Sequence, residues 1–251
     1  MCIRDRMYVI HSLTGYKSVE QFDLTTAWDT STLSHNTRLS VSNSDVQLRA
    51  LAFKPDGTRM YIGQTTYGKV LQYDLSTPFI VTSASFSYAL STTEANGPHA
   101  SASVDNAPED IHFNDAGTQM FIVGSKTGQV HQYTFMGSQF TLSNATHTYS
   151  LTITDEESSP AGITFNPTGT KMFIVGNNGK EVNQYTLSTP FVLSSADHDS
   201  AFSVSSQELN ARAIWFDNTG KKMFVIGFAG DDINVYKLTV PFVLSSASFV
   251  S

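Results

Sequence analysis

The stretch at residues 166–196, "NPTGTKMFIVGNNGKEVNQYTLSTPFVLSSA", recurs with few changes elsewhere in the same chain. Residues 54–84 read "KPDGTRMYIGQTTYGKVLQYDLSTPFIVTSA", and residues 218–247 read "NTGKKMFVIGFAGDDINVYKLTVPFVLSSA". Self-similarity at a period of about 50 residues is typical of repeat architectures. The sequence therefore describes one structural unit written several times, and the fold follows from the fold of that unit.

Each full repeat starts with an apolar pair, a turn and an unbroken apolar run. In the first stretch quoted, the pair is Ile163 and Phe165, the turn is 166–169 and the run is 172–175. The alternating pair predicts one face of a strand, and the unbroken run predicts a strand buried on both faces. Proline and glycine in the turn favour a tight hairpin. One repeat cannot cover both faces of its second strand, so a neighbour is expected on each side.

Two more strands complete the repeat. The third ends at a tyrosine, and a Ser/Thr-Pro-Phe connection leads to a Ser/Thr-rich fourth strand. Four short antiparallel strands per repeat predict an all-β chain that forms a β-propeller with five four-stranded blades. The first blade lacks its first strand, because the repeat pattern opens at strand two. The blades are expected at about 6–45, 46–105, 106–157, 158–208 and 209–251.

The ends of the chain carry a separate expectation. "MCIRDR" resembles translated sequencing-adapter read-through on a metagenomic gene fragment, so residues 1–5 are set aside as an artefact and 6–251 are treated as one propeller domain. Met1 is then not the natural start, and the sequence says nothing about a signal peptide. We expect the blades to be an arc of a larger ring, of roughly six to eight blades.

The motif at residues 55–62, "PDGTRMYI", resembles the core of bacterial YVTN-type propeller repeats and, more broadly, WD40 and lactonase-type propellers. The segment 188–196, "STPFVLSSA", resembles a repeat of marine bacterial and phage surface proteins. The Trp-Asp signature of WD40 blades is missing from the end of strand three, where Tyr185-Thr186 stands in the first stretch quoted. The resemblance implies a propeller but no particular activity, since such blades carry unrelated functions.

Composition excludes several classes of partner. The formal net charge of −7 argues against nucleic acid and anionic membranes, which require a basic surface. No apolar run reaches the roughly 18 residues of a membrane span. The single cysteine, Cys2, excludes an internal disulfide framework. A charged fraction of only 15 %, with many Ser and Thr residues, favours an extracellular, cell-surface or virion location.

Candidate site residues are predicted on one face of the disc. In the resembled families, the loops between strands two and three and between strand four and the next strand one share a face, and ligands bind there. The positions that enter strand one, which include Ala161, should line the mouth of the central channel, and the loop 91–110 is an insertion on the same face. The candidate ligand-binding residues are Arg49, Asn96, His99, Asp105, Glu109, Asp110, Asp155, Glu156, Arg212, Asp231 and Asp232.

Acidic residues accumulate in these loops and allow three interpretations. They form a solvated charged rim, they attract a cationic partner, or they bind Ca²⁺, which takes six to eight oxygen ligands. The proposed calcium set consists of some of Glu109, Asp110, Asp155 and Glu156. The DxDxDG spacing of calcium-binding loops does not occur in the sequence. The alternative is that the chain binds no cofactor. The seven histidines fall out of register with one another along the repeats, so no paired-histidine site is predicted.

A glutamine recurs on strand three as Gln21, Gln72, Gln132 and Gln184, and Val235 replaces it in the last blade. A buried amide repeated in this way is predicted to hydrogen-bond the loop backbone between blades.

Three functions remain open. The first is a non-enzymatic recognition module of a bacterial or phage surface protein that binds a protein or glycan through the loop face. It is favoured because no catalytic motif can be recognised. The second is a Ca²⁺-dependent hydrolase similar to propeller lactonases. The third is a structural spacer in a longer array. The sequence does not indicate an oligomeric state.

Overall fold

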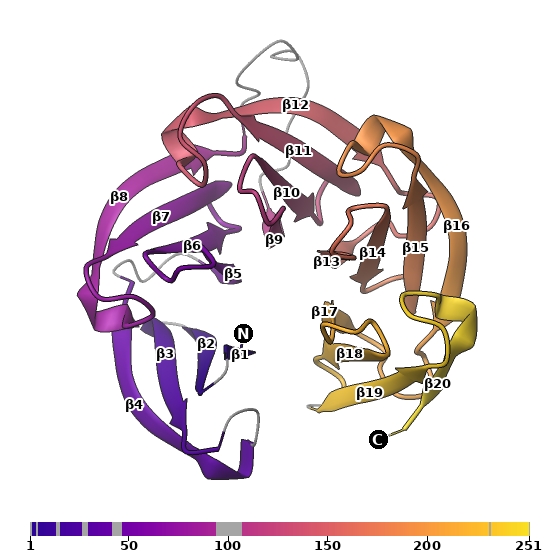
Figure 1. The fold of residues 1–251 in the computed structure, drawn as a ribbon, viewed down its shortest axis with the longest axis horizontal. Helices are drawn as coiled ribbons and strands as arrows, with labels where there is room; N and C mark the ends of the chain where they lie inside the picture. The colour runs from indigo at the N-terminus through magenta and orange to yellow at the C-terminus, as the bar shows by residue number, and fades with distance from the viewer. Residues whose placement is uncertain are drawn as a thin grey trace.

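The computed structural model describes residues 2–3, 5–13, 16–26, 30–41, 47–93, 107–230 and 232–250. It confirms an all-β propeller with five antiparallel blades arranged as sectors of a disc (Figure 1). No α-helix occurs in these ranges. None of the helices found there is long and apolar enough to cross a membrane.

Each blade is a meander whose first strand lines the centre and whose fourth strand forms the rim (Figure 1). Blade 1 has three full strands, β2 (Arg6–Leu13), β3 (Tyr16–Leu24) and β4 (Leu33–Ser40), with a two-residue strand β1 (Cys2–Ile3) paired to β2. The other blades are blade 2, β5 (Leu48–Phe53), β6 (Arg59–Gln64), β7 (Lys69–Leu75) and β8 (Ala84–Ser91); blade 3, β9 (Pro108–Phe113), β10 (Gln119–Gly124), β11 (Gln129–Phe135) and β12 (Ala145–Thr152); blade 4, β13 (Pro160–Phe165), β14 (Lys171–Gly176), β15 (Glu181–Leu187) and β16 (Ala196–Ser203); and blade 5, β17 (Ala211–Phe216), β18 (Lys222–Gly227), β19 (Ile233–Leu238) and β20 (Ala247–Phe249).

A short 3₁₀ helix precedes the fourth strand of every blade. These helices are η1 (Thr30–Thr32), η2 (Val81–Ser83), η3 (Leu142–Asn144), η4 (Leu193–Ser195) and η5 (Leu244–Ser246). The apolar first residue of η2 to η5 is buried in each case. The 3₁₀ helices therefore anchor the rim strands to the core.

The predicted burial of the second strands on both faces is confirmed in blades 2, 3 and 4, whereas Phe224 and Ile226 on the second strand of blade 5 are partly exposed. Met120, Met172 and Met223 are 0 % exposed. The buried residues group into four hydrophobic clusters, and each cluster joins residues of two successive blades. The core is therefore a series of joints between blades rather than one central mass.

A phenylalanine in the connection between strands three and four packs on the first hairpin turn of each full blade; it follows proline in blades 2, 4 and 5 and glutamine in blade 3. Phe191 adopts a left-handed backbone conformation, with φ 58°, and its N–H donates to the carbonyl of the hairpin glycine Gly169 at 2.9 Å. Its ring covers the glycine so closely that a Cβ on Gly169 would lie 2.2 Å from it. Phe79, Phe140 and Phe242 repeat this arrangement in blades 2, 3 and 5. The turn glycine is thus required by its positive φ and by the ring above it.

The strand-three glutamine joins each blade to the next, as the sequence predicts. Gln72 Oε1 accepts the backbone N–H of Leu142 at 2.8 Å, which is the first residue of the 3₁₀ helix in the following blade. The same bond recurs at the other joints, from Val81 to Gln21 (3.1 Å), from Leu193 to Gln132 (3.0 Å) and from Leu244 to Gln184 (3.3 Å). One amide per joint therefore satisfies a buried helix terminus.

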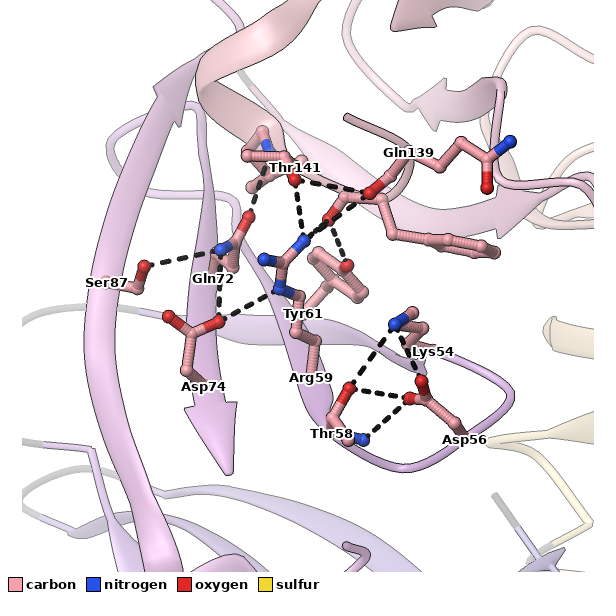
Figure 2. A network of polar contacts seen from close by, with 12 residues as sticks. Lys54, Asp56, Thr58, Arg59, Tyr61, Gln72, Asp74, Ser87, Gln139 and Thr141 are labelled. Carbon is pink, nitrogen blue, oxygen red and sulfur yellow. Dashed lines mark hydrogen bonds and ion pairs between the residues drawn. The ribbon is translucent and has the colours of Figure 1, made fainter. Parts of the chain in front are cut away.

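Figure 2 shows the polar contacts around one such joint, between blades 2 and 3. Arg59 pairs with Asp74 of its own blade at 3.0 Å and reaches across to the carbonyl of Phe140 at 3.1 Å and the hydroxyl of Thr141 at 2.6 Å. Tyr61 also donates to the Phe140 carbonyl. The backbone of the Phe connection is thus held from the preceding blade as well as from its own hairpin.

The prediction that the histidines are out of register is wrong for three of them. His35, His147 and His198 occupy the same place on strand four, opposite the strand-three aromatic in each blade. Their rings pack on Phe22, Tyr133 and Tyr185 at 5.2 to 5.3 Å between centroids. The number of residues between the second-strand methionine and the strand-four histidine differs among the blades, because some connections hold extra residues such as Gly137 (φ 121°) in blade 3. These extra residues change the sequence spacing but not the pairing of the strands.

Candidate functional site at the channel mouth

A cavity of about 400 Å³ opens on the face that carries the loops between strands two and three. The residues that line it come from all five blades and are Ile10, His11, Ser12, Leu48, Arg49, Glu109, Ala161 and Arg212. All four strand-one positions that the sequence places at the mouth, Arg49, Glu109, Ala161 and Arg212, are among them. Blades 2 to 5 therefore present arginine, glutamate, alanine and arginine to the same cavity from equivalent positions.

Two arginines and one glutamate set the charge of this cavity. Arg49 Nε lies 3.7 Å from Glu109 Oε2, and Ser125 Oγ donates to Glu109 Oε1 at 2.8 Å. Arg212 has no hydrogen bond or ion pair with any described residue. Burial and then the charge of Arg49 lower the pKa of the Arg212 guanidinium from its ordinary value. The mouth thus holds one cation more than its anion can neutralise, in a chain whose net charge is −7.

His11 adds a third nitrogen-bearing group that sequence analysis did not single out. Its Nδ1 is shielded from solvent and has no hydrogen-bond partner among the described residues. The ring edge packs on Tyr16 at 5.1 Å between centroids. His11 stands where blades 3 to 5 end strand two with Gly124, Gly176 and Gly227. The replacement of the repeated glycine by histidine in blade 1 is the sequence feature from which His11 could have been predicted as a site residue.

Asp110 does not face the ligand cavity, in contrast to the prediction. Its Oδ1 accepts the N–H of Ile111 at 2.8 Å, and its Oδ2 accepts the N–H of Ile163 in the next blade at 3.0 Å. Burial raises the pKa of Asp110 to about 7, and these two backbone N–H groups offset part of that rise. The carboxyl group therefore joins two first strands instead of contacting a ligand.

The raised pKa of Asp110 predicts a pH dependence of stability. The folded state holds this proton more tightly than the unfolded chain, in which the pKa is near the ordinary 3.8. The contribution is therefore fully present below about pH 4 and is lost as the pH rises to about 7. We expect Asp110→Asn to lose less stability than the wild type between pH 4.5 and 8, measured by urea unfolding. Equal slopes for both proteins would contradict this, and the comparison cancels the titration of other carboxylates.

The proposed calcium set is not assembled. Asp155 is exposed, and Glu156 only accepts a long hydrogen bond from Tyr185 Oη at 3.4 Å. Glu109 pairs with Arg49, and Asp110 holds the backbone. Within the described ranges, no three His, Cys, Asp or Glu side chains lie close enough to hold a metal ion together. These four residues therefore do not fit a shared Ca²⁺ ion.

Asp232 also lies away from the cavity lining, where its Oδ1 accepts a hydrogen bond from Asn234 Nδ2 at 2.9 Å. The other four candidates, Asn96, His99, Asp105 and Asp231, lie outside the described residues.

Two acidic loop residues, Glu157 and Glu208, are buried, so they belong neither to a solvated charged rim nor to the cavity lining. Glu157 is 1 % exposed, and its carboxylate accepts backbone N–H groups of Ser159 (2.8 Å), Asn178 (3.2 Å) and Gly179 (2.8 Å). Glu208 does the same in blade 5 with Asn210 (2.6 Å), Ala229 (3.1 Å) and Gly230 (3.2 Å). Each glutamate thus fastens the loop after strand two to the loop before strand one, and both loops border the channel mouth.

Comparison with known proteins gives a likeness of fold. No protein-family model matches the sequence, and no curated protein matches it. A candidate 6-phosphogluconolactonase from Bacteroides fragilis superposes with a TM-score of 0.66 at 10 % identity, over 98 % of this chain and 79 % of that chain. The periplasmic gluconolactonase PpgL of Pseudomonas aeruginosa gives 0.61 at 12 %, over 98 % and 66 %. The Cps50 (Swd1) β-propeller domain of Myceliophthora thermophila gives 0.57 at 10 %, over 94 % and 66 %.

The shared feature is the β-propeller. Lactonase-type and WD40 propellers are both among the similar structures, and all three compared chains are longer than this one. At 10 to 12 % identity the likeness extends to the fold and not to the chemistry of the mouth.

Proposed function

We propose that this chain is a recognition module that binds an anionic group, a carboxylate or a phosphate, in the cavity at the channel mouth. The observation that carries the proposal is Arg212, which forms no ion pair with a described residue, beside Arg49, whose own partner is Glu109. The carboxylate of Glu208, which also acts on Arg212, is already held by backbone N–H groups. An anion between the arginines would remove the repulsion that now disfavours the charged form of Arg212. Guanidinium groups also match the geometry of carboxylates and phosphates.

The surroundings of the arginines support a specific ligand rather than a diffuse surface attraction. Ile10 and Leu48 give the cavity an apolar side, and His11, whose Nδ1 has no hydrogen-bond partner among the described residues, also lines it. A concave site with a few convergent polar groups is typical of ligand recognition. The sequence predicts a recognition module of a bacterial or phage surface protein that binds a protein or glycan. We propose in addition that the bound protein or glycan carries an acidic group.

A second candidate is the hydrolysis of a sugar-acid lactone. It is favoured by the lactonase-type propellers among the similar structures and by Glu109 and His11, which could move a proton beside a bound anion. This hydrolase hypothesis requires no Ca²⁺, and it replaces the Ca²⁺-dependent hydrolase that the sequence suggests. Turnover of gluconolactone or 6-phosphogluconolactone would distinguish it from simple binding.

Binding of gluconate, 6-phosphogluconate and inorganic phosphate by isothermal titration calorimetry tests the proposal. We expect at least one of these anions to bind and Arg212→Gln to weaken that binding by about 30- to 150-fold, because one charge-assisted contact contributes about 2 to 3 kcal/mol. Affinity should also fall as salt is added.

Arg38→Gln is the matched control, because Arg38 is exposed on the rim strand β4 and contacts Tyr16 rather than the mouth. It should leave affinity unchanged. If none of the three anions binds, or if Arg212→Gln and the wild type bind equally, the proposal fails and the structural spacer becomes the better hypothesis.

A further inference from the structure

Blade 5 leaves an apolar sheet face uncovered. At each inner joint, the second-strand aromatic and its neighbours on the same face are packed under the next blade, as Phe121, Val123 and Val130 are in blade 3. The matching residues of blade 5 are Phe224, Ile226 and Ile233, and all three are partly or largely exposed, with Ile233 at 47 %. Trp215 enlarges this face by stacking on Phe224 at 4.8 Å between centroids.

Blade 1 leaves the opposite half of the same kind of joint uncovered. In blade 2, Met60 and Ile62 face the preceding blade and are fully buried. The matching residues of blade 1 are Met7, which is partly exposed, and Val9, which is 39 % exposed. One molecule therefore carries two different apolar faces, one on blade 5 and one on blade 1. They correspond to the two surfaces that pack against each other in every inner joint.

These two faces do not meet within one molecule. Blades 1 and 5 lie at the two ends of the arc in Figure 1, and they form separate sheets. Strand β2 of blade 1 packs against β5, and the first strands β5, β9, β13 and β17 pack together in succession, whereas β17 has no comparable packing against β2 among the described residues. The four hydrophobic clusters correspond to the four inner joints, and a fifth is not found in that part of the chain.

The free face of blade 5 lacks the glutamine of the inner joints. An inner joint pairs a strand-three glutamine with the backbone N–H of the residue that opens the next 3₁₀ helix. Blade 5 has Val235 at this position, and the 3₁₀ helix of blade 1 opens at Thr30. A contact between these two faces would therefore rest on apolar packing, without the glutamine hydrogen bond.

We propose that the uncovered face of blade 5 binds blade 1 of a second copy of this chain, head to tail, in the manner of an inner joint. The partner is identified by continuity, because four such joints already exist and both of their halves are present on the molecule. The interface is heterologous, since the two contacting faces are different. Each copy therefore keeps one free face of each kind, and assembly proceeds to a closed ring or an open chain.

Sedimentation velocity of the whole chain over a wide concentration range tests this proposal. We expect the mean sedimentation coefficient to rise with concentration for the wild type. Ile233→Asp on blade 5 and Val9→Asp on blade 1 should each abolish that rise, because each places a charge in the apolar contact. Met136→Asp is the matched control, since Met136 is 72 % exposed on a connection of blade 3 and outside both faces.

Mixing the two variants gives the decisive result. Ile233→Asp retains an intact blade 1 face and Val9→Asp retains an intact blade 5 face, so an equimolar mixture should form a one-to-one dimer and nothing larger. Both positions are partly exposed, and unchanged melting curves of the separate variants show that each is folded. A wild type that stays monomeric at all concentrations overturns the proposal. A homodimer of Val9→Asp alone overturns the head-to-tail contact, because it would require blade 5 to bind blade 5.

Discussion

Replacing Gly169 by alanine is expected to lower the free energy of unfolding by about 2 to 5 kcal/mol. Gly169 has φ 69°, a conformation that costs an L-residue about 1 to 2 kcal/mol. The new Cβ would also lie 2.2 Å from the Phe191 ring, and that ring is held in place by the hydrogen bond from the Phe191 N–H to the Gly169 carbonyl. Urea unfolding of the variant and the wild type gives the difference directly.

A double-mutant cycle separates the two causes. Phe191→Ala removes the ring, so the steric part of the Gly169→Ala effect should vanish in the double variant while the conformational part remains. The double variant should therefore be more stable than the sum of the two single effects indicates. Strict additivity would mean that the ring is not what excludes a side chain at position 169.

Replacing Glu157 by alanine should cost about 3 kcal/mol of stability, although Glu157 lies in a surface loop between strands. The carboxylate accepts three backbone N–H groups and is almost completely buried. Alanine leaves these donors without an acceptor, and the loops before strand one and after strand two lose their connection. Hydrogen exchange of the Asn178 and Gly179 amides should increase along with the loss of stability.

Asp155 provides the control for that experiment, because it belongs to the same loop and carries the same charge but is exposed. Asp155→Ala should change the free energy of unfolding by no more than about 0.5 kcal/mol. If the two substitutions have equal effects, then charge in this loop matters and the backbone contacts of Glu157 do not.

These residues mark the limit of prediction from the sequence. The fold could be predicted because the features that specify it recur in every repeat: the alternating pair, the turn glycine, the apolar run and the strand-three glutamine. Repetition also fixes the register, and so the sequence places Arg49, Glu109 and Arg212 at the channel mouth. The sequence pattern does not distinguish Asp155 from Glu157, because burial of a loop carboxylate depends on which backbone N–H groups a neighbouring loop brings to it.

Two further features of the structure could not be predicted from the sequence, and each has a physical reason. The shared place of His35, His147 and His198 is hidden by extra loop residues, which change the numbering but not the strand pairing. Asp110 was assigned to a ligand set as one of the acidic residues in the loops of this face, but Asp110 and Glu109 are adjacent on a strand and therefore point to opposite sides. Its carboxyl group therefore reaches the neighbouring strand while that of Glu109 reaches the cavity.

The division of the core among joints has an evolutionary consequence. Since each joint uses the same glutamine, aromatic residue and 3₁₀ helix, duplication of a whole blade would create a new joint with every contact already in place. Loss of a blade would likewise let its two neighbours meet through matching surfaces. A gene built in this way can change its number of blades in single steps, and selection then acts on what each new copy presents at the centre of the disc.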